Sequence, residues 1–268
     1  MKKWIALPLA ALLCLSCFSA LAEGAFRVGM ECNYPPYNWT QTEPSEHAVP
    51  IEGGMGYADG YDVQIAKRIA EGLGKELVIV KTEWDGLPLG VQSGMIDAII
   101  AGMSPTEERK ATLDFSENYY QCELVLVVRK DSPFAAAKTL SDFSGAVITG
   151  QLNTFHYSVI NQIPGVIVAM AMETFPAMTV ATLSGAVDGY VAERPGAEAD
   201  CMANPDLTYI QFEEGQGFTA SDDDTAIAVG LMKGSPLTAQ INEILAGIDE
   251  ESRVQLMLEA TARQPLNN

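Results

Sequence analysis

The chain has 268 residues, almost half of them hydrophobic (48%), and a formal net charge of −19 at pH 7. An acidic surface of this kind repels phosphate backbones and anionic lipid headgroups, which excludes nucleic acids and such membranes as principal partners. The length and apolar content suit one large domain or two lobes of roughly 100 residues, each with a core of its own.

The first 22 residues have the pattern of a secretory signal peptide. A basic start at Lys2 and Lys3 precedes an apolar run over residues 5–18 and a small-residue cleavage site at 20–22. This apolar run is too short for a membrane span. We therefore expect an exported, periplasmic protein that starts at residue 23, with a lipid anchor at Cys17 as a minor alternative.

Cysteines and histidines are few in the rest of the chain. Cys32, Cys122 and Cys201 are an odd number without a CxxC pair, so neither a zinc site nor a disulfide framework is predicted. One disulfide bond is compatible with an oxidising compartment, but its partners stay open. His47 and His156 alone could hardly build a histidine-based metal centre or a Ser-His-Asp nucleophile. We expect no metal and no cofactor.

Strands and helices alternate in the first part of the mature chain. The first strand ends at Glu31, and an aromatic loop that begins with Tyr34 follows it. The order β-α-β-α-β favours a parallel sheet covered by helices. The elements expected here are strands at 26–30 and 77–80, helices at 60–74 and from Trp84, and a polar surface insertion at 40–59.

The most informative stretch is residues 94–109. Its apolar run at 96–101 predicts a strand that is buried on both faces. Gly102 allows a turn, and Ser104 followed by Pro and Glu predicts the start of a helix. A turn at the carboxyl end of a parallel strand is where open α/β sheets bind ligands, and Arg109 can hold a carboxylate with two parallel hydrogen bonds. We expect a small molecule with a carboxylate group.

A second alternation of strands and helices follows a charged, proline-containing boundary near residue 130. The strands at 123–128 and 225–231 are expected to cross between two lobes and form a hinge, with the ligand in the cleft. Lobe 1 would contain residues 23–128 and 225–268, and lobe 2 residues 129–224. The other elements expected are a loop at 115–120, strands at 146–149, 166–169, 187–192 and 208–210, and helices at 155–163, 174–183, 194–202, 236–248 and 250–262.

These motifs resemble the periplasmic amino-acid-binding proteins of ABC importers, the family 3 solute-binding proteins. The resemblance covers essentially the whole mature chain, and the motif that ends at Arg109 is its most specific part. It implies a two-lobed, type II periplasmic-binding-protein fold with two βα sheets joined by a two-strand hinge. The matching segments are Tyr-Pro-Pro-Tyr (34–37), Gly-Tyr-Asp-Val (60–63), Trp-Asp-Gly-Leu (84–87), residues 97–109, Gln-Leu-Asn-Thr (151–154), Ser-Gly-Ala-Val-Asp-Gly (184–189) and Ile-Asn-Glu-Ile-Leu (241–245).

The resemblance also implies roles for individual residues. Arg109, with backbone N–H groups at Ser104 and Thr154, would hold the α-carboxylate of a free amino acid. Its α-ammonium group would be bound by the Ser104 hydroxyl, the Gly102 carbonyl and the carboxylate of Glu193. Three further residues would surround the side chain: Tyr34 and Trp84 on its two sides, and Glu31 near its tip.

Four departures from the family pattern concern residues in or near these motifs. Glu193 stands where an aspartate is usual, and Asn153 stands where a glycine is common. Glu193 could instead pair with Arg194 or cap the next helix. The other two departures are Gln64 and the pair Pro88-Leu89. Trp84 matches the pattern, but it could alternatively be an ordinary core residue.

The expected function is that of a monomeric, non-enzymatic receptor that delivers a polar or cationic L-amino acid to an ABC permease. An enzyme of the same fold is the alternative, namely a periplasmic dehydratase that uses Glu193 or Glu31 as general acid. A sensor domain is disfavoured, because no transmembrane segment follows residue 23.

Overall fold

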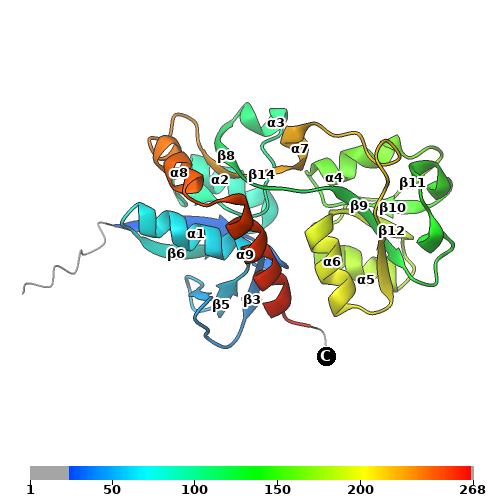
Figure 1. The fold of residues 1–268 in the computed structure, drawn as a ribbon, viewed down its shortest axis with the longest axis horizontal. Coiled ribbons are helices and arrows are strands. Elements are labelled where there is room, and N and C mark those ends of the chain that lie inside the picture. Colours follow the sequence, from blue (N-terminus) through cyan, green and yellow to red (C-terminus); the bar gives the residue numbers. More distant parts are fainter. Residues whose placement is uncertain (1–23, 267–268) are drawn as a thin grey trace, which may run out of the picture.

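Two five-stranded sheets divide the residues that the structure describes, 24–266, into two lobes of this computed structural model (Figure 1). The expected signal peptide lies outside the described residues. The first sheet has the order β6-β1-β7-β14-β8 and the second the order β11-β10-β12-β9-β13. The two-lobed α/β architecture expected from the sequence is thus present.

The first lobe contains the parallel β-α-β units that the periodicity predicts. β1 runs parallel to both β6 and β7, whereas β14 is antiparallel to β7 and β8. Its elements are β1 (Ala25–Met30), α1 (Tyr61–Gly72), β6 (Glu76–Lys81), a 3-10 turn (Trp84–Gly86), α2 (Leu87–Gln92), β7 (Ala98–Ile99), α3 (Glu107–Lys110), β8 (Leu113–Gln121), α7 (Asp222–Thr225), β14 (Ala226–Met232), α8 (Leu237–Ala246) and α9 (Glu250–Arg263).

The second lobe repeats the pattern in its parallel part. β10 pairs in parallel with β11 and β12, and β9 joins the sheet antiparallel to β12 and β13. Its elements are β9 (Leu124–Arg129), 3-10 turns at Pro133–Ala136 and Leu140–Phe143, β10 (Val147–Thr149), α4 (Phe155–Ser158), a 3-10 turn (Val159–Gln162), β11 (Ile167–Val168), α5 (Phe175–Leu183), β12 (Gly189–Glu193), α6 (Arg194–Ala203) and β13 (Leu207–Ile210).

The crossing between the lobes differs from the expected one. β9 lies wholly in the second sheet, so residues 124–128, which we assigned to the first lobe, belong to the second. The apolar run of this strand could belong to either sheet, and its pairing with β12 places it in the second sheet. Conversely, α7 starts in the segment that we assigned to the second lobe, but it packs on β14 and pairs with Lys110 of the first. The two crossings lie side by side where the Cys122 N–H donates to the Thr225 carbonyl at 3.0 Å.

Two segments expected to be irregular are strands. The segment 40–59 contributes to a small antiparallel sheet of β2 (Asn33–Tyr34), β3 (Asn38–Gln41), β5 (Tyr57–Asp59) and β4 (Val49–Pro50). The segment 115–120, expected to be a loop, belongs to β8. Both expectations were wrong because polar residues also form strands where pairing with a neighbouring strand satisfies the backbone.

Residues 94–109 differ in detail from the predicted strand, turn and helix. The buried strand is only Ala98–Ile99, and the helix after it is capped by Thr106, whose hydroxyl accepts from the Arg109 N–H at 3.4 Å. Ser104 is therefore not the N-cap that we expected. Residues 100–105 run as irregular chain, which leaves the polar groups around Gly102 and Ser104 free of helix hydrogen bonds.

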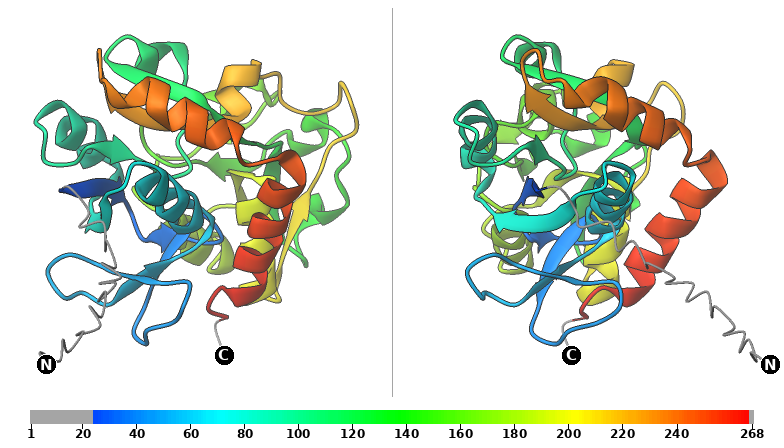
Figure 2. Two further views of the ribbon diagram at one scale, coloured as in Figure 1. Left: turned by 60° about the vertical axis from the view of Figure 1, so that its left-hand side comes forward. Right: turned by 90° about the vertical axis from the view of Figure 1, so that its left-hand side faces the viewer.

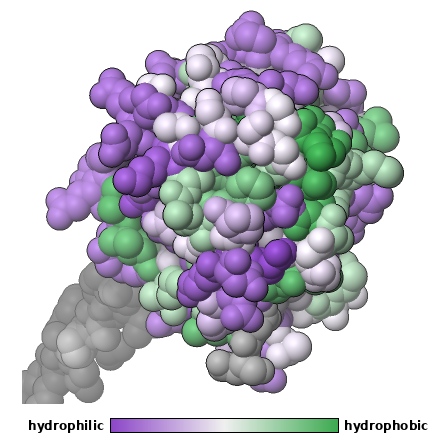
Figure 3. All heavy atoms as spheres, turned by 90° about the vertical axis from the view of Figure 1, so that its right-hand side faces the viewer, coloured by the Kyte–Doolittle hydropathy of each residue, from purple (hydrophilic) through white to green (hydrophobic). Residues whose placement is uncertain are grey.

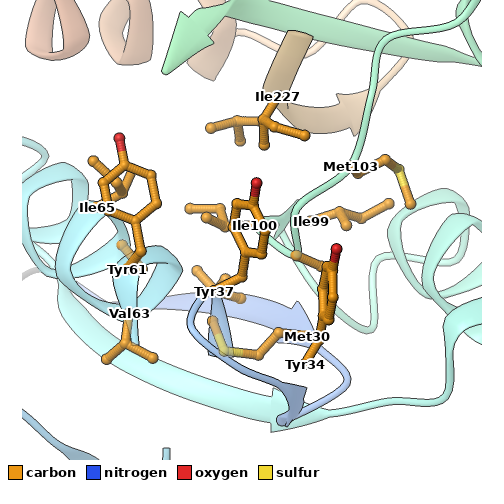
Figure 4. Close-up of a cluster of buried hydrophobic side chains, with 14 of the residues drawn as sticks. Met30, Tyr34, Tyr37, Tyr61, Val63, Ile65, Ile99, Ile100, Met103 and Ile227 are labelled. Carbon is orange, nitrogen blue, oxygen red and sulfur yellow. The ribbon is translucent and has the colours of Figure 1, made fainter. Parts of the chain in front are cut away.

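Aromatic and branched side chains fill the core of the first lobe. Figure 4 shows Tyr61 and Ile65 of α1 facing Ile100, with Met30 and Ile227 from neighbouring strands. Gly60 caps α1 with φ 133°, and an added Cβ would lie 2.7 Å from the carbonyl carbon of Tyr37. Only glycine fits this entry to the helix.

The C-terminal helix α9 contacts both lobes. It packs on α1 of the first lobe and on α6 of the second, and Figures 1 and 2 show it in red at the C-terminal end of the chain. Beyond it, the Gln264 Nε2 group donates to the Ala199 carbonyl at 3.2 Å. The chain end therefore adds a link between the lobes beside the two crossings.

The outer end of the second lobe carries exposed apolar side chains (green in Figure 3) among hydrophilic ones. The edge strand β11 exposes Ile167 and Val168, and Met170 follows it. Because this edge strand is two residues long, it offers little backbone for pairing with another chain. No helix within residues 24–266 is long and apolar enough to cross a membrane.

Candidate functional site

A pocket between the lobes brings most of the expected ligand-binding residues together. Seven of the eight residues line it, the exception being Glu31, which contacts the pocket residue Gln151. The first lobe contributes Tyr34, Trp84, Gly102, Ser104 and Arg109, and the second lobe contributes Thr154 and Glu193. Segments that are separated by up to 159 positions thus meet at one place.

Arg109 reaches across the pocket from α3. Its Nη1 donates to the Ser104 carbonyl at 3.0 Å and its Nη2 to the Asn153 carbonyl of the second lobe at 3.1 Å. Its guanidinium carbon lies 5.0 Å from the centre of the Trp84 ring, a cation–π arrangement. Burial lowers the pKa of Arg109 to about 10, although the charge of Glu193 opposes the shift.

The positive charge of Arg109 has no close anionic partner. In the described part of the chain, no carboxylate lies within ion-pair distance of its guanidinium group, which still carries its charge at neutral pH. Arg109 is partly buried, and a charge that has lost part of its hydration without a counter-ion is unfavourable, so an anion that enters the pocket would relieve this cost. Trp84, expected to enclose the ligand side chain with an ordinary core position as the alternative, lines this pocket and also belongs to the buried core of the first lobe.

Glu193 lies at the end of β12 and is almost completely buried, with 2% of its surface exposed. Its carboxylate accepts from His156 Nε2 at 3.0 Å and from the Tyr34 hydroxyl of the other lobe. Burial raises the pKa of Glu193, but His156 and Tyr34 outweigh this effect and the pKa falls below its usual value. Arg194, the alternative partner, pairs with Glu198 instead.

Glu193 therefore stays ionised and keeps acceptor capacity. A carboxylate offers about four lone-pair sites, and two protein donors leave sites for a ligand. The additional methylene of glutamate, compared with the usual aspartate, lets the carboxylate extend to Tyr34. The departure from the family pattern thus coincides with a hydrogen bond between the lobes.

Tyr34 lies in a stack of three rings. Tyr37 is on one side, with ring centres 5.0 Å apart, and Phe175 of the second lobe is on the other, at 4.0 Å with an interplanar angle of 15°. The ring that faces Tyr34 is therefore Phe175, which we did not foresee when we expected Tyr34 and Trp84 to enclose a ligand side chain. The Tyr34 hydroxyl remains directed at Glu193.

The acidic end of the site is formed around Glu31. Its buried carboxylate accepts from Gln151 Nε2 at 3.3 and 3.4 Å. Burial raises the pKa of Glu31 to about 7, the Gln151 bond opposes this shift, and the charges of Glu83 and Asp85 add to it. Glu83 and Asp85 line an adjoining cavity of about 230 Å³ together with Trp84 and Glu173. Several negative charges thus gather beyond Trp84.

Asn153 links the lobes at the mouth of the pocket. It adopts a left-handed conformation with φ 55°, which directs its carbonyl to Arg109 and to Trp84 Nε1, the latter at 3.5 Å. Its side-chain Nδ2 donates to Asp85 at 2.9 Å. Next to it, the Thr154 hydroxyl donates to the Gln151 carbonyl at 2.7 Å.

Several residues at the site were missed as ligand-site candidates from the sequence, four of which make the contacts described above. Gln151, Asn153 and His156 belong to the turn and first helical turn after β10, a position where side chains at the carboxyl end of a parallel strand gather. Their position at the end of a parallel strand could therefore have identified them as ligand-site candidates. Phe175 opens α5 and had no such signal, because an apolar residue at a helix start is ordinary core material.

Neither a disulfide bond nor a cluster of metal ligands occurs among the residues that the structure describes. Cys32, Cys122 and Cys201 are free thiols, so the one disulfide bond that we left open is not formed. No group of three potential metal ligands occurs within residues 24–266.

The family profile described as bacterial extracellular solute-binding proteins, family 3, matches residues 26–260. The chain belongs to this family. A probable histidine-binding protein of Campylobacter jejuni is 29% identical over 199 residues, covering 74% of this chain and 72% of the relative. The arginine-binding extracellular protein ArtP of Bacillus subtilis is 25% identical over 95% of this chain and 96% of its own length.

A solved structure shows the same fold. The amino acid ABC transporter substrate-binding protein AbpA of Streptococcus pneumoniae, crystallised with L-arginine, superposes with a TM-score of 0.75 at 23% identity. The superposition covers 89% of this chain and 94% of that one. The family and the two-lobed fold inferred from the motifs of this solute-binding protein are therefore confirmed. Nothing in these likenesses supports the dehydratase alternative.

Proposed function

We propose that this protein is a periplasmic receptor that binds one free L-amino acid with a cationic side chain and presents it to the permease of an ABC importer. The observation that carries the proposal is the pocket between the lobes, in which Arg109 and Glu193 supply opposite charges from opposite lobes. An amino acid is a zwitterion, so it complements both charges at once.

The preference for a cationic side chain rests on the acidic groups beyond Trp84. Glu31 is buried there, and Glu83 and Asp85 are close enough to raise its pKa further. A cation placed among these groups would be attracted by all three and would favour the ionised form of Glu31. The relatives named above as histidine- and arginine-binding proteins support the same ligand class.

Binding would follow from closure of the two lobes around the ligand. Arg109 and the backbone near Ser104 would hold the carboxylate, Glu193 the ammonium group, and the ring of Trp84 would form one wall. The pairs Asn153–Asp85 and Tyr34–Glu193 join the lobes and would hold them together around the bound molecule. We infer a monomer, because one chain supplies every group of the site.

A thermal-shift and calorimetric panel of the twenty amino acids tests the proposal. L-Arginine, L-lysine or L-histidine should raise the melting temperature by several degrees, because a ligand that binds only the folded state stabilises it. Arg109→Ala should abolish the response, whereas Arg68→Ala, which removes an arginine on α1 outside the pocket, should not. A wild-type protein that responds to no amino acid, or an Arg109→Ala variant that responds fully, would refute the function.

A further inference from the structure

Two turns in the left-handed conformation carry groups of the site. Cys32, directly after Glu31 and the end of β1, has φ 57°, and Gly102, shortly after β7, has φ 64°. A cysteine seldom adopts this conformation, and it persists only where neighbouring groups hold it. Because β1 and β7 are parallel neighbours, both turns lie at the same edge of the first sheet. Some group at this edge must therefore hold the backbone in place.

One buried carboxylate is connected to both turns. Asp62, in the first turn of α1, has 0% of its surface exposed. Its Oδ2 accepts from Asn38 Nδ2 at 2.8 Å, and Asn38 Oδ1 accepts from the Cys32 N–H at 2.8 Å. Its Oδ1 accepts from the Tyr119 hydroxyl at 2.7 Å, and that hydroxyl accepts from the Gly102 N–H at 3.4 Å. Asp62 thus has two arms, one through Asn38 and one through Tyr119.

Both hydrogen-bond partners of the Asp62 side chain lie outside its own helix. An acidic residue in the first turn commonly interacts with the free N–H groups of that turn, but Asp62 bonds to Asn38 on β3 and Tyr119 on β8. Burial raises the pKa of Asp62 to about 6, and the donors Tyr119, Asn38 and the Gly102 N–H oppose the shift. The carboxylate is therefore mainly ionised at neutral pH, when it only accepts hydrogen bonds.

The Gly102 arm ends at an acceptor that the ligand can use. Gly102 lines the pocket, and no donor among residues 24–266 is bonded to its carbonyl. The family resemblance assigns this carbonyl to the α-ammonium group. Since the N–H of the same residue is bonded to Tyr119, the position of the carbonyl depends on that bond. The other arm ends beside Glu31, in the acidic part of the site proposed for a cationic side chain.

We propose that Asp62 is a positioning residue that sets both ends of the ligand site without contacting the ligand. Through Tyr119 it holds the Gly102 carbonyl for the α-ammonium group, and through Asn38 it holds the turn that follows Glu31. Asp62 itself is not among the residues that line the pocket. The inference rests on the proposed function and assigns each arm to a different end of the amino acid. Loss of one arm should therefore weaken recognition at one end alone.

Three ligands measure the two ends separately. L-Arginine and δ-guanidinovalerate differ in the α-amino group alone, so the ratio of their dissociation constants reports the end at Gly102. L-Arginine and L-citrulline differ in the charged tip of the side chain, so their ratio reports the end at Glu31. If L-lysine is the tighter ligand, ε-aminocaproate and L-norleucine are the matching analogues, and for L-histidine they are imidazolepropionate and L-thiazolylalanine.

Two variants each remove one arm. Tyr119→Phe should reduce the preference for L-arginine over δ-guanidinovalerate about fivefold, the value of one hydrogen bond, and leave the preference over L-citrulline unchanged. Asn38→Ala should do the reverse. The matched control is Tyr61→Phe, since the Tyr61 hydroxyl donates to the Tyr119 carbonyl at 2.7 Å and belongs to neither arm. This control loses a buried hydroxyl bond in the same core, and both of its ratios should equal those of the wild type.

Asp62→Asn tests the carboxylate itself. Two donors face Asp62, and an amide offers one acceptor oxygen, so one arm must break whichever way the amide lies. At least one of the two affinity ratios should fall about fivefold in calorimetry at pH 8.

The two tyrosine variants distinguish positioning from general stability. A Tyr119→Phe variant that keeps the full preference for the α-amino group, or a Tyr61→Phe variant that loses it equally, would overturn the proposal and leave the receptor function intact. If Asn38→Ala or Asp62→Asn does not fold, the comparison of the two tyrosine variants decides alone. If the wild-type protein binds none of the twenty amino acids, the receptor function is refuted and this inference with it.

Discussion

Replacing Glu31 by glutamine should stabilise the protein at alkaline pH and leave its stability almost unchanged in acid. The physical reason is the burial of this carboxyl group, which has 3% of its surface exposed and lies beside the like charges of Glu83 and Asp85. The single contact with Gln151 Nε2, at 3.3 Å or more, does not compensate for the loss of hydration. A neutral amide of nearly the same shape avoids this penalty.

The size of the effect follows from the pKa. Glu31 titrates at about 7 in the folded protein and has an unperturbed value of 4.5. A raised carboxyl pKa means that folding favours the protonated form, so the folded state has its full stability below pH 4.5 and loses it as the pH rises to about 7. At about 1.4 kcal/mol per pKa unit, the loss approaches about 3 kcal/mol above pH 7. For a protein of this size that corresponds to a melting temperature about 6–12 °C higher for Glu31→Gln at pH 8.

Urea unfolding followed by tryptophan fluorescence at several pH values between about 4.5 and 8 measures the difference. Glu71→Gln, at an exposed position on α1, is the matched control and should show no trend with pH. A Glu31→Gln variant whose gain is the same at pH 4.5 and 8 would refute the reasoning, since a pH-independent change would arise from packing. A loss of stability at pH 8 would do the same.

Two other substitutions test the backbone and the ring stack. Gly60→Ala places a Cβ 2.7 Å from the Tyr37 carbonyl carbon at a φ of 133°. We therefore expect the unfolding free energy, measured by chemical denaturation, to fall by about 3 kcal/mol. A change below about 0.5 kcal/mol would contradict the strain argument. Phe175→Ala removes the ring on Tyr34 and joins the pocket to the neighbouring cavity of about 390 Å³ that both rings line. The Phe175→Ala substitution should lower the unfolding free energy by about 3 kcal/mol and increase affinity for amino acids with larger side chains. Unchanged relative affinities across the panel of amino acids would show that Phe175 does not limit ligand size.

Most of the architecture could be read from periodic patterns. The helical spacing of Tyr61, Ile65 and Ile69 predicts α1, and the structure buries these residues. Such patterns succeed because burial of one face repeats at the period of the element itself. The sequence also placed two opposite charges on the two lobes. Glu193 ends β12 as expected, whereas Arg109 lies on the short helix α3 and not at the end of a strand.

The errors share a cause. The loop expected at 115–120 is part of β8, and the strand at 124–128 belongs to the other lobe, because the hydrogen bonds that define both come from strands far away in the sequence. Ser104 was misread as a helix cap for a related reason. The short helix α3 starts at Thr106, and the preceding residues extend into the pocket instead.

Local composition and spacing predicted two α/β lobes, the motifs indicated the family to which they belong, and seven of the eight residues proposed for the site line one pocket between the lobes. The partners of those residues depend on how the lobes meet: Tyr34 and Glu193 are 159 positions apart, and their hydrogen bond exists only where β2 and β12 face each other. The stack of Phe175 on Tyr34 and the surroundings of the unpaired His156 nitrogen also depend on how the two lobes meet. Contacts between distant segments leave no period in the sequence, since each depends on the position of a whole lobe and not on neighbouring residues.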